Sequence, residues 1–192
     1  MDLMSHRWHQ GLWIGALLLV VGSVSAQAPD AAALEQRVEN IERVNLTAPW
    51  QVSADLIKAL GSERTTLTEP LRFRIELVEA RNFALAGDYT SGLAMAESML
   101  ARKIAPELRI RALTLAVNMA TNISDYPRAF TWLQEGLALH DQIDTPQSRL
   151  LGMASYLYLR VGEERAALDY ARQALAAARS DGTDRDRCVA LS

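Results

Sequence analysis

The chain has 192 residues, of which 49% are apolar and 22% are charged, and its formal net charge is −3. This length and apolar content predict one folded domain and exclude a disordered tail, while the near-neutral charge excludes the broad basic surface of a nucleic-acid-binding protein. Three histidines and one cysteine, Cys188, are too few for a Cys-rich zinc site or an internal disulfide framework.

The first 26 residues have the three parts of a secretory signal peptide. Arg7 and the α-amine make the start positive, residues 11–21 form an apolar run without a charge, and small residues follow as far as Ala28. The apolar stretch is shorter than the about 20 residues that cross a hydrocarbon core. We therefore predict a cleaved signal peptide, with an uncleaved membrane anchor as the alternative. Both place the remaining chain outside the cytoplasm, in the periplasm or on the periplasmic face of the inner membrane.

After the leader, apolar residues recur with helical periodicity. Leu34, Val38 and Ile41 share one face of a predicted helix, and no segment alternates apolar and polar residues long enough to indicate a strand. Prolines stand where apolar periods begin, which suits the first turn of a helix, and Thr145 and Asp125 are candidate N-caps. These prolines are Pro29, Pro49, Pro70, Pro106, Pro127 and Pro146. The sequence therefore predicts an all-α fold.

Three segments of the chain are similar to one another. Residues 86–93, 123–130 and 161–168 each place a small residue at a turn and continue into a helical pattern. The equivalent positions Gly87, Ser124 and Gly162 follow one another at spacings of 37 and 38 residues. Such self-similarity at a fixed period is typical of stacked helical repeats.

The three copies resemble the tetratricopeptide repeat, a helix–turn–helix unit of 34 residues. The third copy fits best, with Leu151, Ala154, Ser155 and Tyr158 in its first helix and Ala167, Ala171 and Ala174 in its second. The first copy departs most, because Glu76 and Glu79 stand where apolar residues are expected. The resemblance implies a right-handed helix–turn–helix solenoid, since no single pair hides its apolar face. The alternative is a plain helical bundle with coincidental turns.

This reading divides the chain into consecutive segments. They are a signal peptide at 1–26, a degenerate leading helix pair at 27–66, repeats at 67–104, 105–143 and 144–181, and the start of a further helix at 182–192. A solenoid normally ends in a capping helix with a polar outer face. Because the last segment reads Val189, Ala190, Leu191 instead, we expect the chain to be a piece of a longer protein.

No arrangement in the expected mature chain is typical of an active site. His140 is its only histidine, and it lies at a predicted helix end, where the dipole favours a protonated imidazole. The paired carboxylates Glu163 and Glu164 lie in a predicted turn and are read as solvated surface. The sequence contains no phosphate-binding loop and no nucleophile elbow. We therefore predict no catalytic residue, no metal site and no cofactor.

The resemblance to the tetratricopeptide repeat implies a concave face lined by the first helix of each repeat. Carried over position by position, its candidate ligand-binding residues are Arg74, Arg81, Arg111, Asn118, Asn122, Arg149, Tyr156 and Arg160, with Thr114 and Thr121 beside them. Guanidinium forks and amides suit a carboxylate, a phosphate or a peptide backbone. We therefore expect a protein or peptide partner, or a small anionic ligand, in this groove. The alternative is that these arginines merely cover solvated helix faces.

A second resemblance concerns the chain as a whole. The leader, the opening helix pair and residues 81–89 and 156–163 resemble the extracytoplasmic part of repeat-containing bacterial diguanylate cyclases. In that family, periplasmic repeats precede a transmembrane helix and a cytoplasmic GGDEF domain, which makes cyclic di-GMP from two GTP. The resemblance implies a sensory input region. This sequence lacks the GGDEF signature, so no cyclase residue is assigned.

Two alternatives to a sensor remain open at this point. A free periplasmic scaffold or adaptor for envelope proteins would need no output domain, and an exported hydrolase would need catalytic residues beyond Ser192. Helical repeats bind peptides, proteins and small molecules alike, so the pattern does not identify the ligand. We expect membrane contact only through the leader or a downstream segment, and a homodimer is compatible with the pattern.

Overall fold

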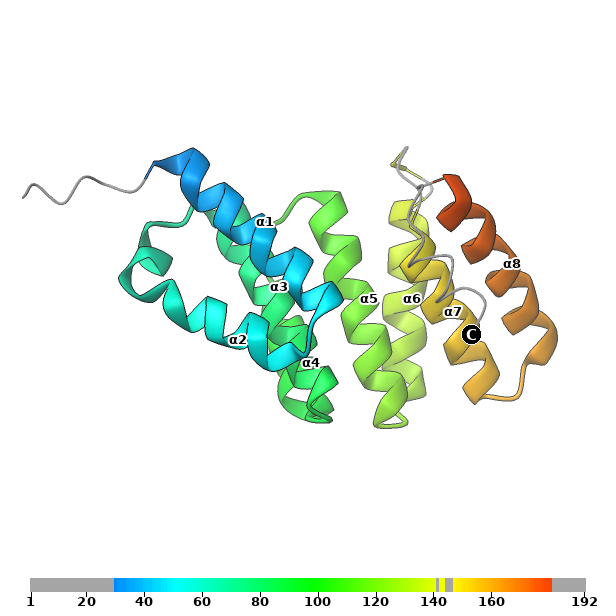
Figure 1. The fold of residues 1–192 in the computed structure, drawn as a ribbon. Helices are drawn as coiled ribbons and strands as arrows, with labels where there is room; N and C mark the ends of the chain where they lie inside the picture. Colours follow the sequence, from blue (N-terminus) through cyan, green and yellow to red (C-terminus); the bar gives the residue numbers. More distant parts are fainter. Residues whose placement is uncertain (1–29, 141, 144–146, 181–192) are drawn as a thin grey trace, which may run out of the picture.

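The computed structural model of the chain describes residues 30–140, 142–143 and 147–180. These residues form eight α-helices and one 3₁₀ helix, and no β-strand occurs among them (Figure 1). The prediction of an all-α fold is therefore confirmed for the part of the chain that the structure describes. Some predictions fall outside the described residues: the signal peptide at 1–26, the cap at Thr145 and Pro146, the helix start at 182–192 and the role of Cys188.

The helices follow one another with short connections. In chain order they are α1 (Ala31–Thr47), α2 (Trp50–Ala59), the 3₁₀ helix η1 (Gly61–Thr66), α3 (Glu69–Leu85), α4 (Tyr89–Leu100), α5 (Pro106–Asn122), α6 (Tyr126–His140), α7 (Ser148–Arg160) and α8 (Glu164–Ser180). Pro70 and Pro106 lie in the first turns of α3 and α5, where a missing N–H costs nothing. Asp125 accepts a hydrogen bond from the Arg128 backbone N–H at 3.3 Å, which confirms its predicted capping role.

The three similar segments of the sequence form the same turn. Gly87, Ser124 and Gly162 each have positive φ, at 82°, 62° and 82°. In each turn the N–H of the next residue reaches a carbonyl five positions back: Asp88 to Phe83 at 2.9 Å, Asp125 to Ala120 at 2.8 Å and Glu163 to Tyr158 at 2.9 Å. This is the Schellman ending of a helix, which requires one residue in the left-handed region. The sequence similarity is therefore also a similarity of local structure.

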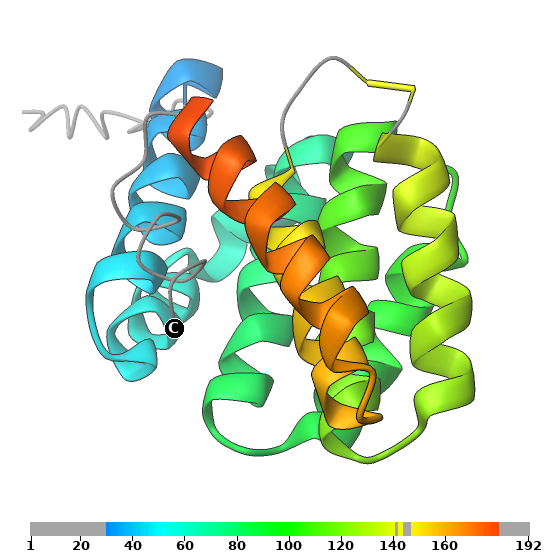
Figure 2. The ribbon, with the colours of Figure 1, turned by 90° about the vertical axis from the view of Figure 1, so that its right-hand side faces the viewer.

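The helices are arranged in a row along the molecule. Each helix packs against the next one in the chain, and α1, α3, α5 and α7 also contact one another in that order. Figure 1 shows the row running from α1 and α2 at one end to α8 at the other, and Figure 2 views it from the α8 end. The odd-numbered helices therefore lie side by side, and side chains on their common face are brought together from distant parts of the sequence.

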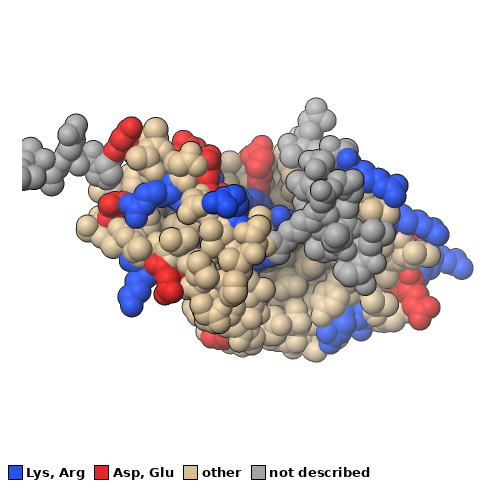
Figure 3. Space-filling model, viewed as in Figure 1, with Lys and Arg blue, Asp and Glu red and all other residues tan. Residues whose placement is uncertain are grey.

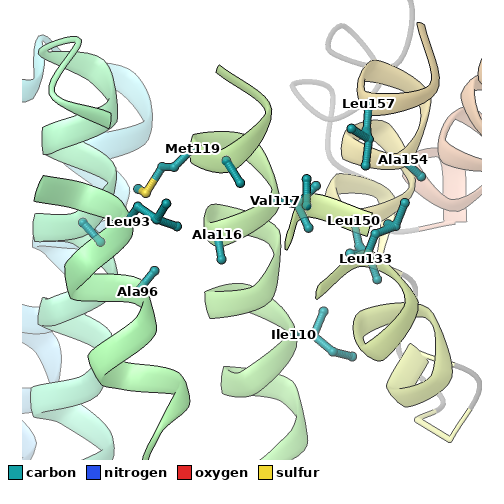
Figure 4. Packing of buried hydrophobic residues seen from close by; sticks show 13 residues of the cluster. Leu93, Ala96, Ile110, Ala116, Val117, Met119, Leu133, Leu150, Ala154 and Leu157 are labelled. Atoms are coloured by element: carbon teal, nitrogen blue, oxygen red, sulfur yellow. The ribbon is translucent and has the colours of Figure 1, made fainter. Parts of the chain in front are cut away.

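The main hydrophobic core is centred on α5. Met119 of this helix points towards Leu93 of α4, while Val117 points to the opposite side, where Leu133 and Leu150 lie (Figure 4). Many of the buried side chains are alanines, which let neighbouring helices approach closely: Ala80, Ala96, Ala116, Ala120, Ala129 and Ala154 are all fully buried. The dense packing of α5 between α4, α6 and α7 fixes the relative positions of these helices.

A second core joins α1, α2, η1 and α3. Its buried apolar residues are Leu34, Val38, Ile41, Ile57, Leu60, Leu67, Ile75 and Val78. Beside it lies a buried polar cluster in which Asn45 donates to Ser53 at 3.0 Å and to Asn82 at 2.6 Å. Because these three residues belong to α1, α2 and α3, the cluster fixes the leading helix pair onto α3 while leaving its buried polar atoms hydrogen-bonded.

The two glutamates that depart from the repeat pattern are ion-paired. Glu79 accepts hydrogen bonds from both terminal nitrogens of Arg64, each at 2.6 Å, and Glu76 forms an ion pair with Arg102. Paired in this way, the carboxylates tolerate half-buried positions that would otherwise require apolar side chains. None of the helices in the described part of the chain combines the length and apolar character needed to cross a membrane.

Candidate functional site

The predicted ligand-binding residues lie on three of the odd-numbered helices. Arg74 and Arg81 belong to α3, and the others are distributed over two neighbouring helices: Arg111, Asn118 and Asn122 on α5, and Arg149, Tyr156 and Arg160 on α7. Because α3, α5 and α7 pack side by side, some of these side chains come together: Glu42 joins Arg74 to Arg111, and Tyr156 lies beside Asn122. We refer to these eight residues, all exposed or half-buried, together as the polar face.

The N-terminal half of the polar face is organised around a residue that the sequence analysis missed. Glu42 of α1 accepts hydrogen bonds from Arg74, at 2.6 Å from Nη2 and 3.1 Å from Nε, and from Nη2 of Arg111 at 2.7 Å. Glu35 lies 3.7 Å from Nη1 of Arg74. Arg74 and Arg111 thus already have an internal carboxylate as partner, and Glu42 connects α1 to both α3 and α5.

The environment of Glu42 favours its charged form. Burial by itself raises the pKa of this carboxyl, but the hydrogen bonds and charges of Arg74 and Arg111 outweigh it and hold the pKa below its usual value. The same hydrogen bonds raise the pKa of Arg74 above its usual value. This cluster is therefore a fixed ion-pair network at physiological pH, and its positive charges are compensated within the chain.

The C-terminal half of the polar face is built from hydrogen bonds between α5 and α7. Asn118 donates from Nδ2 to the Met153 sulfur at 3.4 Å, and Asn122 donates to the Asn118 carbonyl at 2.8 Å. The Tyr156 hydroxyl lies 3.4 Å from Oδ1 of Asn122 and accepts a hydrogen bond from Nη1 of Arg160 at 2.9 Å. Polar side chains from two helices are therefore held in fixed positions beside an arginine.

The remaining predicted residues occupy different environments. Arg81 is half-buried on α3, and Arg149 is exposed in the first turn of α7. Thr114 is half-buried and donates to the Ile110 carbonyl at 2.8 Å. Thr121 is fully buried, with its hydroxyl bound to the Val117 carbonyl at 2.6 Å, so its expected place on the ligand-binding face is wrong. The reason is that α5 packs against four helices, α3, α4, α6 and α7, which together cover the side that carries Thr121.

A separate cavity of about 210 Å³ lies between η1, α3 and α4. Its lining consists of Arg64, Glu76, Met95, Ser98, Met99 and Arg102. Both arginines are neutralised, Arg64 by Glu79 and Arg102 by Glu76, and the Arg102 guanidinium also lies 5.0 Å from the centre of the Phe73 ring. The charged groups of this cavity are therefore engaged with one another and leave no net charge for a ligand.

The distribution of charge distinguishes the two ends of the molecule. In Figure 3, basic and acidic side chains are mixed over the N-terminal helices, while at the end that carries α8 basic side chains are more prominent, although an acidic group lies among them. Within the described ranges, no three His, Cys, Asp or Glu side chains are grouped so that they could hold a metal ion. His140 lies in the last turn of α6, where the sequence placed it.

The polar face is thus a surface of guanidinium, amide and phenol groups on packed helices. Such groups donate and accept hydrogen bonds in fixed directions, which suits recognition of a carboxylate or a peptide backbone. No family model, no curated protein and no solved structure matches this chain.

Proposed function

We propose that this chain is an extracytoplasmic binding module, built as a right-handed solenoid of tetratricopeptide-like helix pairs, whose polar face receives a protein, peptide or small anionic ligand. One observation carries the proposal: side chains from three helices that pack side by side meet on a single surface. The common Schellman turns at Gly87, Ser124 and Gly162 further support the repeat architecture.

We further propose that the module is the sensory input region of a membrane-bound diguanylate cyclase. The support is the resemblance of the leader and of residues 81–89 and 156–163 to such proteins. In a row of helix pairs, each pair contacts mainly its neighbours, so a ligand that joins α5 to α7 biases the angle between consecutive pairs. A ligand shifts that equilibrium only as far as it binds one arrangement better than the other.

Export is tested by fusing alkaline phosphatase, which needs the disulfides of an oxidising compartment, to the end of the chain. We expect an active fusion, and we expect Leu17→Arg, a charge within the apolar part of the leader, to abolish its activity. The matched control is Leu168→Arg, which introduces the same charge at an exposed position of α8 outside the leader. An inactive fusion of the unchanged chain would contradict an extracytoplasmic location.

Binding at the polar face is tested by a photo-crosslinking amino acid at Thr114, between Arg111 and Asn118 on α5. The matched control carries the same group at Gln134, an exposed position on α6. We expect a defined cross-linked product in periplasmic extract at Thr114 and none at Gln134. Equal products at both positions, or none at Thr114, would contradict a binding role for the polar face.

The sensory role is tested by reading the gene beyond the codon for Ser192. We expect the frame to continue into further helical sequence, about 20 apolar residues and a GGDEF domain. A stop codon directly after Ser192 would overturn the cyclase proposal and favour the periplasmic scaffold. Neither result affects the photo-crosslinking experiment, so the binding role and the signalling role are decided separately.

A further inference from the structure

Arg160 differs from Arg74 and Arg111 in the groups that contact its guanidinium. The two N-terminal arginines share the Glu42 carboxylate, whereas the contacts of Arg160 within the described chain are with phenols. Its Nη1 donates to the Tyr156 hydroxyl at 2.9 Å, and its guanidinium carbon lies 5.8 Å from the centre of the Tyr156 ring. No carboxylate in the described residues forms an ion pair with Arg160, so its positive charge is oriented but not neutralised.

A second phenol, that of Tyr126, also interacts with the Arg160 guanidinium. The pKa of Tyr126 lies below its usual value because Ser124 hydrogen-bonds to it and the Arg160 charge acts on it. Tyr126 begins α6, directly after the turn in which α5 ends, and Arg160 ends α7. The nearest acidic residue of that turn, Asp125, is bound to Arg128 at 2.6 Å and does not compensate Arg160. Two tyrosines from different helices therefore flank one exposed positive charge.

The chemistry of this arrangement suits a single negative charge. A guanidinium has five N–H donors in one plane, and its two phenol partners Tyr156 and Tyr126 engage only part of them, so further donors remain for hydrogen bonds to a carboxylate. One arginine carries one positive charge, which a carboxylate balances and a phosphate dianion would exceed. The neighbouring amides of Asn118 and Asn122 extend the polar surface along α5, where a peptide backbone would lie.

The N-terminal half of the polar face, around Arg74 and Arg111, is less favourable for an acidic ligand. Glu35, Glu39 and Glu42 all lie on α1 near Arg74, and the two arginines there are already paired. An incoming carboxylate would have to displace Glu42 and approach two further glutamates, whereas at Arg160 it meets an unneutralised guanidinium. The electrostatics of the chain therefore favour its C-terminal half.

We propose that Arg160, Tyr156 and Tyr126 form a receptor for a carboxylate of an acidic peptide segment in a partner protein, seated where α5 and α7 meet. The inference rests on the proposed binding role of the polar face and narrows it to one half of that face and one class of ligand. The carboxylate belongs either to a Glu or Asp side chain or to a chain terminus.

The site is tested by NMR titration of the full chain, following the Nε–H resonance of Arg160. The probes are N-acetylglutamate amide, which carries only a side-chain carboxylate, N-acetylglycine, which carries only a terminal one, and neutral N-acetylglutamine amide. We expect saturable shifts with at least one carboxylate probe and none with the neutral probe. The probe that binds more tightly identifies the source of the carboxylate.

Matched variants decide whether the site is specific. Arg160→Gln is expected to weaken binding of the carboxylate probe on the order of tenfold, the loss expected for one charge-assisted bidentate pair. Arg172→Gln removes an equally positive, exposed arginine of α8 and is expected to leave binding unchanged. Absence of a shift at Arg160, equal shifts with the neutral probe, or equal binding by Arg160→Gln would overturn the inference.

The partner-level test separates this inference from the proposed function. A cross-linked partner at Thr114 that is captured equally well by the Arg160→Gln chain would overturn the carboxylate receptor and leave the binding role of the polar face intact. Loss of that partner with Arg160→Gln, together with its retention in Arg172→Gln, supports both. No cross-linked product at Thr114 contradicts the proposed function, and the NMR titration still decides whether Arg160 receives a carboxylate.

Discussion

Glu42 and Arg111 are 69 positions apart in the sequence, yet Oε1 of the glutamate lies 2.7 Å from Nη2 of the arginine. The same carboxylate binds Arg74, so one side chain of α1 joins the two helices that follow it along the polar face. Glu42 and Arg74 are each only 19% exposed, which limits the screening of their attraction by water. The leading helix pair is therefore tied to the rest of the chain by charge as well as by its apolar core.

Glu42→Gln is expected to lower the free energy of unfolding by about 2 kcal/mol, because hydrogen bonds to charged groups contribute on that order. Urea unfolding followed by circular dichroism measures the change. Glu39→Gln, an exposed position one turn earlier on α1, is the control and is expected to change stability by less than about 0.5 kcal/mol. Equal effects of the two variants would show that the Glu42 network adds nothing beyond a surface charge.

The contribution of Glu42 is expected to depend on pH. Its pKa in the folded chain lies below the usual value of 4.5, so its stabilisation is complete above that value and disappears as the pH falls through the folded-state pKa. The free energies of unfolding of the unchanged chain and of Glu42→Gln, measured in urea, should therefore differ at pH 7 and become equal in acid. A difference that grows as the pH falls would contradict this assignment.

Substitutions at the positive-φ turn residues Ser124 and Gly162 are expected to change the stability of the chain in opposite directions. Ser124→Gly should stabilise the chain by about 1 kcal/mol, because a residue with a Cβ is strained at a φ of 62°. Gly162→Ala should destabilise it by a similar amount, and since no atom lies within 4 Å of the added Cβ, the cost is conformational. Thermal unfolding of both variants measures the effect, and shifts of the same sign would refute this explanation.

Gly92 lies where α4 closely approaches α3 and α5. A Cβ at this position would lie 2.8 Å from Cε of Met119 and 3.1 Å from the carbonyl oxygen of Ala80. Gly92→Ala is therefore expected to destabilise the chain by about 1–3 kcal/mol, because the end of the Met119 side chain must move and the Ala80 carbonyl must shift slightly. Gly152→Ala, where the added Cβ meets nothing within 4 Å, should instead stabilise α7 by up to about 1 kcal/mol. Chemical denaturation of the two variants gives the comparison.

In the buried polar cluster of Asn45, Ser53 and Asn82, loss of the Asn82 amide is expected to destabilise the chain strongly. Asn82→Ala removes one of the two acceptors of Asn45, at 2.6 Å, and the acceptor of Ser53 at 3.1 Å, so we expect a loss of about 2–3 kcal/mol in the free energy of unfolding. Gln36→Ala, an exposed position on α1, serves as the control and should be nearly neutral. If Asn82→Ala proved as mild as Gln36→Ala, Asn45 would have found another partner.

Much of the local structure follows from the sequence alone. Helical periodicity predicts the all-α fold, Asp125 is recognisable as a cap, and the small residues at Gly87, Ser124 and Gly162 mark the three turns. Each of these features depends on neighbouring residues: the spacing of apolar side chains, a side chain that bonds to the next turn, and a residue that tolerates positive φ. The signal peptide, the tetratricopeptide identity and the sensory role stay predictions.

The tertiary structure decided which charges are partnered. Three features depend on how helices far apart in the sequence are placed side by side. They are the pairing of Glu42 with Arg74 and Arg111, the burial of Thr121, and the lack of a carboxylate partner for Arg160 among the residues that the structure describes. Local periodicity states which side of a helix is apolar but not which neighbour covers it, nor at what register. A charged residue predicted to line a groove can therefore either bind a ligand or belong to an internal ion pair. For Arg74 and Arg111, the packing of α1 against α3 and the position of Glu42 beside both arginines decide between the two.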